Sequence, residues 1–203
     1  GMREIDDPGR AAMALTIAAA NDVNQLTDYT SQGFTGPGST AGLEEDYKPD
    51  VMAPGGSAGY YTSILSVDSN TNDGAPFSDQ QTQDYVGLQG TSMASPFAAG
   101  CAALVIHALE SIGTNWSFSS SAHARLVKML LCATASESNT NREGDANNPT
   151  LERASSGPSG YPVGKDRNEG YGMINPDAAV AAVMTRFTTG LTNASLGPGT
   201  MDQ

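Results

Sequence analysis

Ser92 is the residue whose type and position in this chain best suit covalent chemistry. It lies in residues 90–96, Gly-Thr-Ser-Met-Ala-Ser-Pro, just before an apolar run over 98–112 that ends at Gly113. Such a run predicts a buried helix, with Ser92 where a loop enters the helix N-terminus. Unpaired N–H groups and the helix dipole favour negative charge there, so Ser92 could attack a carbonyl and help to hold the oxyanion that forms.

Helix capping is the simpler role for Ser92, because most Gly-Thr-Ser steps before helices do only that. We expect Pro96 to fall in the first turn of the helix, the place where its missing N–H is tolerated. A nucleophilic serine needs, in addition, a base and an acid that orients the base.

Neither histidine is placed to be that base. His107 lies 15 residues after Ser92 on the same predicted helix, which corresponds to about 22 Å at the usual rise per residue. His123 follows a short connection from the far end of that helix and should be about 20 Å from Ser92 by the same measure. We therefore expect both histidines to lie on the surface or to have satisfied structural roles.

Length and charge limit the classes of function. The 203 residues are enough for one domain or a large part of one. The formal net charge is −12, with only 10 Lys and Arg, so nucleic acid would be repelled. We expect no membrane span, because no stretch approaches the roughly 20 apolar residues that a span needs. The acidic balance suits solubility or bound cations such as Ca²⁺.

The two cysteines match neither zinc-binding nor redox spacing. Cys101 falls in the helix that follows Ser92, and Cys132 falls in the next apolar segment. The simplest interpretation is two small buried apolar side chains. A disulfide between them is an open alternative.

Apolar runs and turn residues outline the other elements. The patterns predict strands over residues 13–20, 60–67 and 85–89, and helices over residues 122–134 and 178–184. The strand over 13–20 is apolar throughout, as in a parallel sheet, although its periodicity also fits a helix. Residues 136–169 are polar and have no period, so we expect a surface excursion there.

Four segments, in order, resemble passages of the subtilisin-like serine proteases (subtilases, peptidase family S8). The string around Ser92 continues into Ala-Ala-Gly like the family's serine signature, with Phe97 where the family usually has His. Residues 48–55 read Lys-Pro-Asp-Val-Met-Ala-Pro-Gly, and residues 170–180 read Gly-Tyr-Gly-Met-Ile-Asn-Pro-Asp-Ala-Ala-Val. The turn over 7–10 with the strand after it is the fourth match. Together they cover roughly residues 7–184.

The resemblance implies an α/β fold, the three-layer α/β/α subtilisin-like arrangement with a mostly parallel sheet. In the family, the Asp and His of the catalytic triad precede the serine in chain order, and we identify no counterpart of either here. The chain is therefore interpreted as the C-terminal half of a catalytic domain, and its fold as incomplete. Residues 1–186 would belong to that domain, and residues 187–203 would form a loose tail.

The resemblance also implies an activity. The full-length protein would be a serine-type endopeptidase in which Ser92 forms an acyl-enzyme, and this chain alone is expected to be inactive. The Ser92 N–H, with a weaker contribution from Thr91, would support the oxyanion, and no cofactor is required for the chemistry. A non-catalytic subtilase-like scaffold or binding module is the alternative.

A weak structural site for Ca²⁺ or Na⁺ is a further implication of the resemblance. Its ligands would be backbone carbonyls in the turn near the N-terminus and one carboxylate before the Ala-Pro-Gly sequence, namely Gly9, Ala11, Ala14 and Asp50. Lys48 stands where some members of the family have a second acid, which counts against a divalent ion. The same turn often contains a cis proline, so the Asp7–Pro8 bond is a candidate.

The expected partners also follow from the resemblance. They are a protein or peptide substrate and either the N-terminal half of the same catalytic domain or a second copy of this chain. Half a sheet would expose an apolar edge and an uncovered face, which favours such an association. A secreted or extracellular location is implied by the family.

Overall fold

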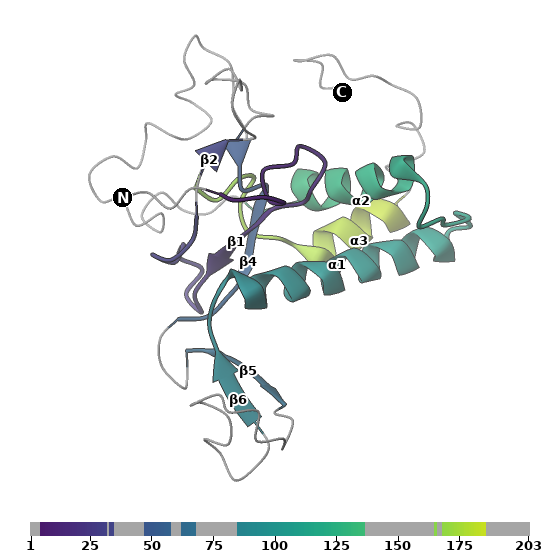
Figure 1. Ribbon diagram of the computed structural model, residues 1–203. Helices are drawn as coiled ribbons and strands as arrows, with labels where there is room; N and C mark the ends of the chain where they lie inside the picture. Colours follow the sequence, from purple (N-terminus) through teal and green to yellow (C-terminus); the bar gives the residue numbers. More distant parts are fainter. Residues whose placement is uncertain are drawn as a thin grey trace.

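The computed structural model describes residues 5–31, 33–34, 47–57, 62–67, 85–136, 165 and 168–185. The elements in chain order are β1 (Ile17–Ala20), β2 (Gly33–Phe34), β3 (Tyr47–Lys48), β4 (Val51–Pro54), β5 (Ile64–Val67), β6 (Tyr85–Leu88), α1 (Thr91–Ser111), α2 (Ser121–Ala133) and α3 (Pro176–Met184) (Figure 1). Most of the predicted excursion over 136–169 and all of the predicted tail over 187–203 lie outside the described residues.

A parallel pair of strands, β1 and β4, forms the sheet against which the helices pack. The register runs from Ile17 opposite Val51 to Ala20 opposite Pro54. On the other side of β4, Met173 forms a parallel bridge with Met52 and an antiparallel bridge with Ser136. The structure therefore confirms the predicted α/β class with parallel strands.

β1 is shorter than the strand predicted over residues 13–20. Met13 is 60 % exposed, and the Ala14 N–H donates to the carbonyl of Ala11 at 3.0 Å, which closes a turn. The Ala14 carbonyl accepts hydrogen bonds from Lys48 and Lys128. Because these tertiary bonds occupy the backbone before residue 16, the strand begins only at Ile17.

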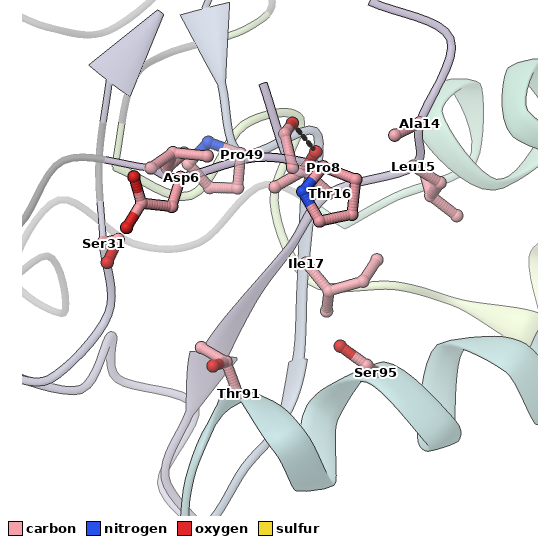
Figure 2. A pocket seen from close by; sticks show the side chains of 12 residues that line it. Asp6, Pro8, Ala14, Leu15, Thr16, Ile17, Ser31, Pro49, Thr91 and Ser95 are labelled. Atoms are coloured by element: carbon pink, nitrogen blue, oxygen red, sulfur yellow. Dashed lines mark hydrogen bonds between the residues drawn. The ribbon is translucent and has the colours of Figure 1, made fainter. Parts of the chain in front are cut away.

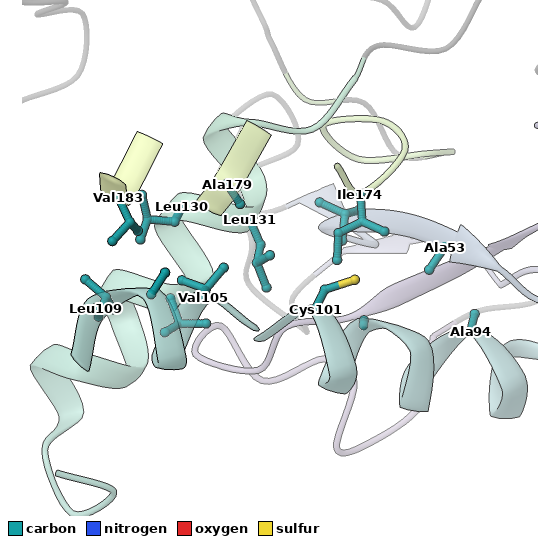
Figure 3. Packing of buried hydrophobic residues seen from close by; sticks show 14 of the residues in the cluster. Ala53, Ala94, Cys101, Val105, Leu109, Leu130, Leu131, Ile174, Ala179 and Val183 are labelled. Carbon is teal, nitrogen blue, oxygen red and sulfur yellow. The ribbon is translucent and has the colours of Figure 1, made fainter. Parts of the chain in front are cut away.

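The helices pack on one face of the β1–β4 pair. That face presents Ala19, Val51 and Ala53 to a core that α1, α2 and α3 complete. Figure 3 shows this core, in which Cys101 and Val105 of α1 lie near Leu131 of α2 and Ala179 of α3. Among the residues that the structure describes, no helix covers the opposite face, so only one helical layer of the predicted three-layer arrangement is seen.

α1 is buried along one side and exposed along the other. Its buried residues are Ala94, Ala98, Cys101, Val105, Ala108 and Leu109. Phe97 and Leu104 on the other side are 44 % and 54 % exposed. The prediction of a helix buried all round is therefore wrong for this part of the chain, since apolar residues cover both sides of α1 but packing covers only one.

α1 is also long and apolar enough to cross a membrane by length and composition alone. The expectation that no stretch of the sequence approaches a membrane span is therefore wrong on that criterion. The buried side of α1 packs against β1, β4, α2 and α3, which is how a core helix of a domain packs.

The caps of α2 and α3 confirm their predicted starts. The Ser120 hydroxyl accepts a hydrogen bond from the His123 N–H at 3.3 Å at the start of α2. The Asn175 side chain accepts from the Ala178 N–H at 3.0 Å, and Pro176 is the first residue of α3. Side-chain oxygens at this position satisfy N–H groups that the first helical turn leaves unpaired.

β5 and β6 form an antiparallel hairpin in which Ile64 lies opposite Leu88. The predicted strands over 60–67 and 85–89 are confirmed in type, and the loop predicted between them lies outside the described residues. Leu65 and Val67 are 50 % and 72 % exposed, so this hairpin packs little against the helical core. It leads directly into the segment that carries Ser92.

Candidate active site

Ser92 is the second residue of α1 and lies at the carboxyl ends of the parallel strands. The Gly90 N–H donates to the Gly55 carbonyl at 2.9 Å, and the Gly55 N–H donates to the Ala20 carbonyl at 2.8 Å. These two bonds fix the start of α1 to the ends of β4 and β1 (Figure 1). In α/β proteins, this edge of the sheet is where ligands usually bind.

Two glycines and a tyrosine shape the chain before Ser92. Gly90 has a φ of 145°, which L side chains rarely adopt. A Cβ atom on Gly55 would lie 2.5 Å from the Cβ of Ala19, so only glycine fits at that position. The Tyr29 hydroxyl bonds to the carbonyls of Gly55 and Gly56 at 3.0 and 2.5 Å. Burial raises the pKa of Tyr29, which keeps this hydroxyl protonated as a donor.

The Ser92 side chain is exposed and does not cap α1. The Met93 and Ala94 N–H groups donate to the Gly90 carbonyl at 3.0 and 3.3 Å. Within the described part of the chain, the Ser92 hydroxyl and the N–H groups of Thr91 and Ser92 have no hydrogen-bond partner. An accessible hydroxyl therefore lies beside unbonded donors at the positive end of a helix, which is the geometry that favours an oxyanion.

Pro96 was predicted in the first turn of α1, but it lies in the second turn. α1 begins at Thr91, so Pro96 is its sixth residue. At this position the missing N–H is one that would otherwise donate to the Ser92 carbonyl. The helix therefore forgoes one of its own hydrogen bonds at the residue that carries the candidate nucleophile.

The two histidines lie away from Ser92. His107 is exposed on α1, about four helical turns beyond Ser92. His123 Nδ1 accepts a hydrogen bond from the Ser117 N–H at 3.0 Å, and its ring stacks on Trp116 with 4.9 Å between centroids. These positions match the expectation that each histidine lies on the surface or has a satisfied structural role.

Asp50, the carboxylate of the predicted cation site, lies before β4, at the opposite end of that strand from Ser92. It is 1 % exposed. Lys48 Nζ and Lys165 Nζ each lie 2.8 Å from one of its oxygens, and Lys128 Nζ lies 3.2 Å away. The Thr16 N–H also donates to it, at 2.8 Å. We call Lys48, Lys128 and Lys165 around Asp50 the lysine cluster.

Burial and charge act against each other within the lysine cluster. Burial alone would raise the pKa of Asp50, but the ammonium group of Lys165 and the hydrogen bonds from Lys165 and Lys48 hold that pKa below its usual value. Burial lowers the pKa of Lys48 to about 8, although its bond to Asp50 opposes the change. The carboxylate is therefore ionised, and Lys48 releases its proton at a lower pH than an ordinary lysine.

The other predicted cation ligands are bonded to donors of the protein itself. The Gly9 carbonyl accepts from the Thr16 hydroxyl at 2.6 Å, and the Ala11 carbonyl accepts from the Ala14 N–H at 3.0 Å. The Ala14 carbonyl accepts from two members of the lysine cluster, at 2.8 and 2.7 Å. In the residues described, no group of three or more His, Cys, Asp and Glu side chains could hold a metal. The cation site stays a prediction.

Two open questions from the sequence are answered by the geometry. Cys101 and Cys132 are both free, so the alternative of a disulfide between them is wrong. Burial raises the pKa of both thiols, that of Cys132 to about 11. The Asp7–Pro8 peptide bond is cis, as predicted, and the Lys48–Pro49 bond is cis as well.

A cavity of about 340 Å³ lies between the first turns of α1 and the turn near the N-terminus. Thr91 and Ser95 line it from α1, Ile17 from β1, and Asp6 and Ser31 from the far end (Figure 2). The cavity is therefore lined by Thr91, the residue directly before the candidate nucleophile.

Several residues that build these sites gave no signal in the sequence. Lys128 and Lys165 are ordinary surface-type residues in a helix pattern and a polar segment, and nothing near them indicates a contact with Asp50. Asp6 and Tyr29 lie in segments whose turn residues predict loops but not their partners. The Lys48-Pro49-Asp50 string and the turn over 7–10, through their resemblance to the family, pointed to this region.

An exposed serine at the mouth of a core helix is a feature shared by several classes of hydrolase, and the comparison with known families decides among them. The model of the subtilase family (Peptidase S8) matches residues 2–175. Since this is most of the chain, the chain belongs to the subtilase family.

Named relatives match shorter parts of the chain. The serine protease AprX of Bacillus subtilis (strain 168) is 34 % identical over 106 residues, which is 50 % of this chain and 22 % of AprX. The PII-type proteinase of Lactococcus lactis subsp. cremoris is 32 % identical over 105 residues, which is 52 % of this chain and 4 % of the proteinase. The chain thus matches about a fifth or less of these relatives' length.

Two solved structures are similar at lower identity. Fervidolysin from Fervidobacterium pennivorans, a keratinolytic enzyme related to subtilisin, is 19 % identical with a TM-score of 0.49, covering 86 % of this chain and 20 % of fervidolysin. A lanthipeptide protease is 21 % identical with a TM-score of 0.49, covering 82 % of this chain and 40 % of the protease.

Proposed function

We propose that Ser92 is the nucleophile of a serine-type endopeptidase in the full-length protein. The observation that carries this proposal is the exposed Ser92 hydroxyl beside unbonded N–H groups at the N-terminus of α1, in a chain of the subtilase family. A cap would use the serine oxygen to accept a bond from the first turn, and this serine does not do so.

The proposed reaction follows the template of serine hydrolases. Ser92 Oγ attacks the carbonyl carbon of a peptide bond and gives its proton to a histidine that the N-terminal half of the catalytic domain supplies. The C–N bond breaks, the amine leaves with that proton, and water then hydrolyses the acyl-enzyme. The Ser92 N–H holds the oxyanion, Thr91 makes a weaker contribution, and no cofactor takes part.

The proposal includes a partner for this chain. His107 and His123 lie away from Ser92, so the chain alone hydrolyses no peptide bond. The N-terminal half of the same catalytic domain, or failing that a second copy of the chain, covers the exposed side of α1 around Phe97 and Leu104, where apolar side chains face solvent. A protein or peptide substrate and an extracellular location complete the proposal.

A fluorophosphonate probe tests both the nucleophile and the incompleteness. We expect the probe to label Ser92 in the full-length protein, to leave this chain alone unlabelled, and to give no label in the full-length Ser92→Ala variant. Ser95→Ala is the matched control, because Ser95 lies one turn further along α1, and that variant should still be labelled. Full-length protein without any label would overturn the enzyme in favour of the non-catalytic scaffold, and robust labelling of the chain alone would overturn the incompleteness.

Light scattering tests the partner. We expect this chain alone to associate or to bind a dye for apolar surface, and we expect the Leu104→Ser variant to do so less. A monodisperse monomer without dye binding would contradict the covered-face proposal.

A further inference from the structure

The lysine cluster joins segments that are distant in the sequence. Lys48 belongs to β3, Lys128 to α2, and Lys165 to the segment before residues 168–175. All three ammonium groups meet at one carboxylate, at 2.8, 3.2 and 2.8 Å. The side chains of Lys48 and Lys165 are only 1 % and 4 % exposed, so these contacts are shielded from water.

The same ammonium groups also hold the turn near the N-terminus. Lys128 Nζ donates to the carbonyls of Ala12 and Ala14 at 2.9 and 2.7 Å, and Lys48 Nζ donates to the Ala14 carbonyl at 2.8 Å. Asp50 completes the connection by accepting the Thr16 N–H. The turn is thereby attached to β4 and to α2 through charge-assisted hydrogen bonds, which are the stronger class.

This set of atoms does not fit a bound metal ion. Ca²⁺ takes six to eight oxygen ligands at about 2.3–2.6 Å. Both carboxylate oxygens of Asp50 and the Ala14 carbonyl already accept bonds from ammonium groups, and the Gly9 carbonyl accepts from the Thr16 hydroxyl. Three ammonium groups face one carboxylate here, so a further cation would meet a like charge at each approach.

We propose that Lys48 and Lys128, with Lys165, take the place of the cation that the family resemblance implies. The ammonium groups bridge Asp50 and the carbonyls of the turn, and this location binds neither Ca²⁺ nor Na⁺. The protein thus carries its own fixed cations at a position where other chains would depend on the ion content of the medium.

Hydrogen exchange of the turn tests the proposal at the location itself. We expect the amide hydrogens of residues 9–16 to exchange at the same rate in excess chelator, in millimolar CaCl₂ and in NaCl, whatever ions bind elsewhere in the chain. Slower exchange of this segment when Ca²⁺ or Na⁺ is added would overturn the proposal. Because the measurement uses the unmodified chain, it does not depend on whether a variant folds.

A substitution tests whether the ammonium groups hold the turn. Lys128→Met removes bonds to two carbonyls and one carboxylate, so residues 9–16 should exchange about tenfold faster or more. Arg125→Met is the matched control, since Arg125 lies on the same helix and, among the residues described, bonds only to Ser121, so it should leave this segment unchanged. Unchanged exchange in Lys128→Met would overturn the bridging role.

Discussion

Asp50 and Ser92 lie near opposite ends of β4, and their surroundings differ completely. Asp50 is 1 % exposed, and four donors of the chain itself satisfy its two oxygens. Ser92 is exposed and has no hydrogen-bond partner in the part of the chain that the structure describes. A buried charge needs partners within the folded chain because burial removes its water, whereas an exposed hydroxyl remains hydrated without them. At one end of β4 the chain therefore satisfies its own polar groups, and at the other end it leaves polar groups free to meet other molecules.

Removing the carboxylate should produce the largest effect. Asp50→Asn leaves three ammonium groups around a neutral amide, and breaking a buried ionic site in this way costs about 3–5 kcal/mol. Urea unfolding would measure the loss in the free energy of unfolding. Asp22→Asn, at an exposed position, is the control and should change stability by less than about 0.5 kcal/mol. Equal stability of the two variants would mean that Asp50 is not the centre of a self-sufficient site.

The buried and exposed sides of α1 differ in the same way, here through apolar side chains. Leu109 is 1 % exposed, so Leu109→Ala should lower the free energy of unfolding by about 2–5 kcal/mol. Leu104 is 54 % exposed, and Leu104→Ala should cost well under half as much in this chain. The same urea titration compares them. Similar losses for both variants would show that the exposed side is covered in solution, for example by a second copy.

Alkaline pH should change the free energy of unfolding through Lys48 in the lysine cluster. The pKa of Lys48 is about 8 in the folded chain, compared with the usual 10.5, so the unfolded chain binds more protons between these two pH values. The free energy of unfolding should therefore rise with pH across this window. Lys48→Met should lack this increment, which is read as the difference between the two proteins at pH 8 and pH 10. A difference that stays constant with pH would contradict the shifted pKa.

The smallest effect on stability is expected at Ser92. Ser92→Ala removes a hydroxyl without a partner in the described chain, so the free energy of unfolding should change by less than about 0.5 kcal/mol. Thermal or urea unfolding measures this change. A loss well above that value would indicate a structural bond from Ser92, and the comparison with Asp50 would then fail.

Short sequence patterns predicted the parts of the fold that depend on residues close together in the sequence. The Ser92 helix, the Asn175 cap before α3 and the cis Asp7–Pro8 bond were each anticipated from a short string of residues or its family resemblance. The extent of β1 was not, because its first residue depends on lysine bonds to the Ala14 carbonyl. The uncovered side of α1 was also missed, since an all-round apolar composition does not indicate which side finds a partner.

The long-range polar contacts were beyond the reach of sequence patterns. Lys165 is 115 residues from Asp50 along the chain, and no periodicity links two such positions. Lys128 occupies a helix position whose usual interpretation is a solvated surface. A residue pair of this kind becomes visible only when the fold brings its members together, so the sequence did not indicate the lysine contacts at Asp50, where the family resemblance implies a cation site.

The lysine cluster also has a consequence for how the molecule comes apart. The turn before β1, the helix α2 and Lys165 all meet at one carboxylate, so detaching any one of them breaks a hydrogen bond or an ion pair to this buried group. Partial opening at this corner is therefore disfavoured, and these distant segments should melt together as a single cooperative unit.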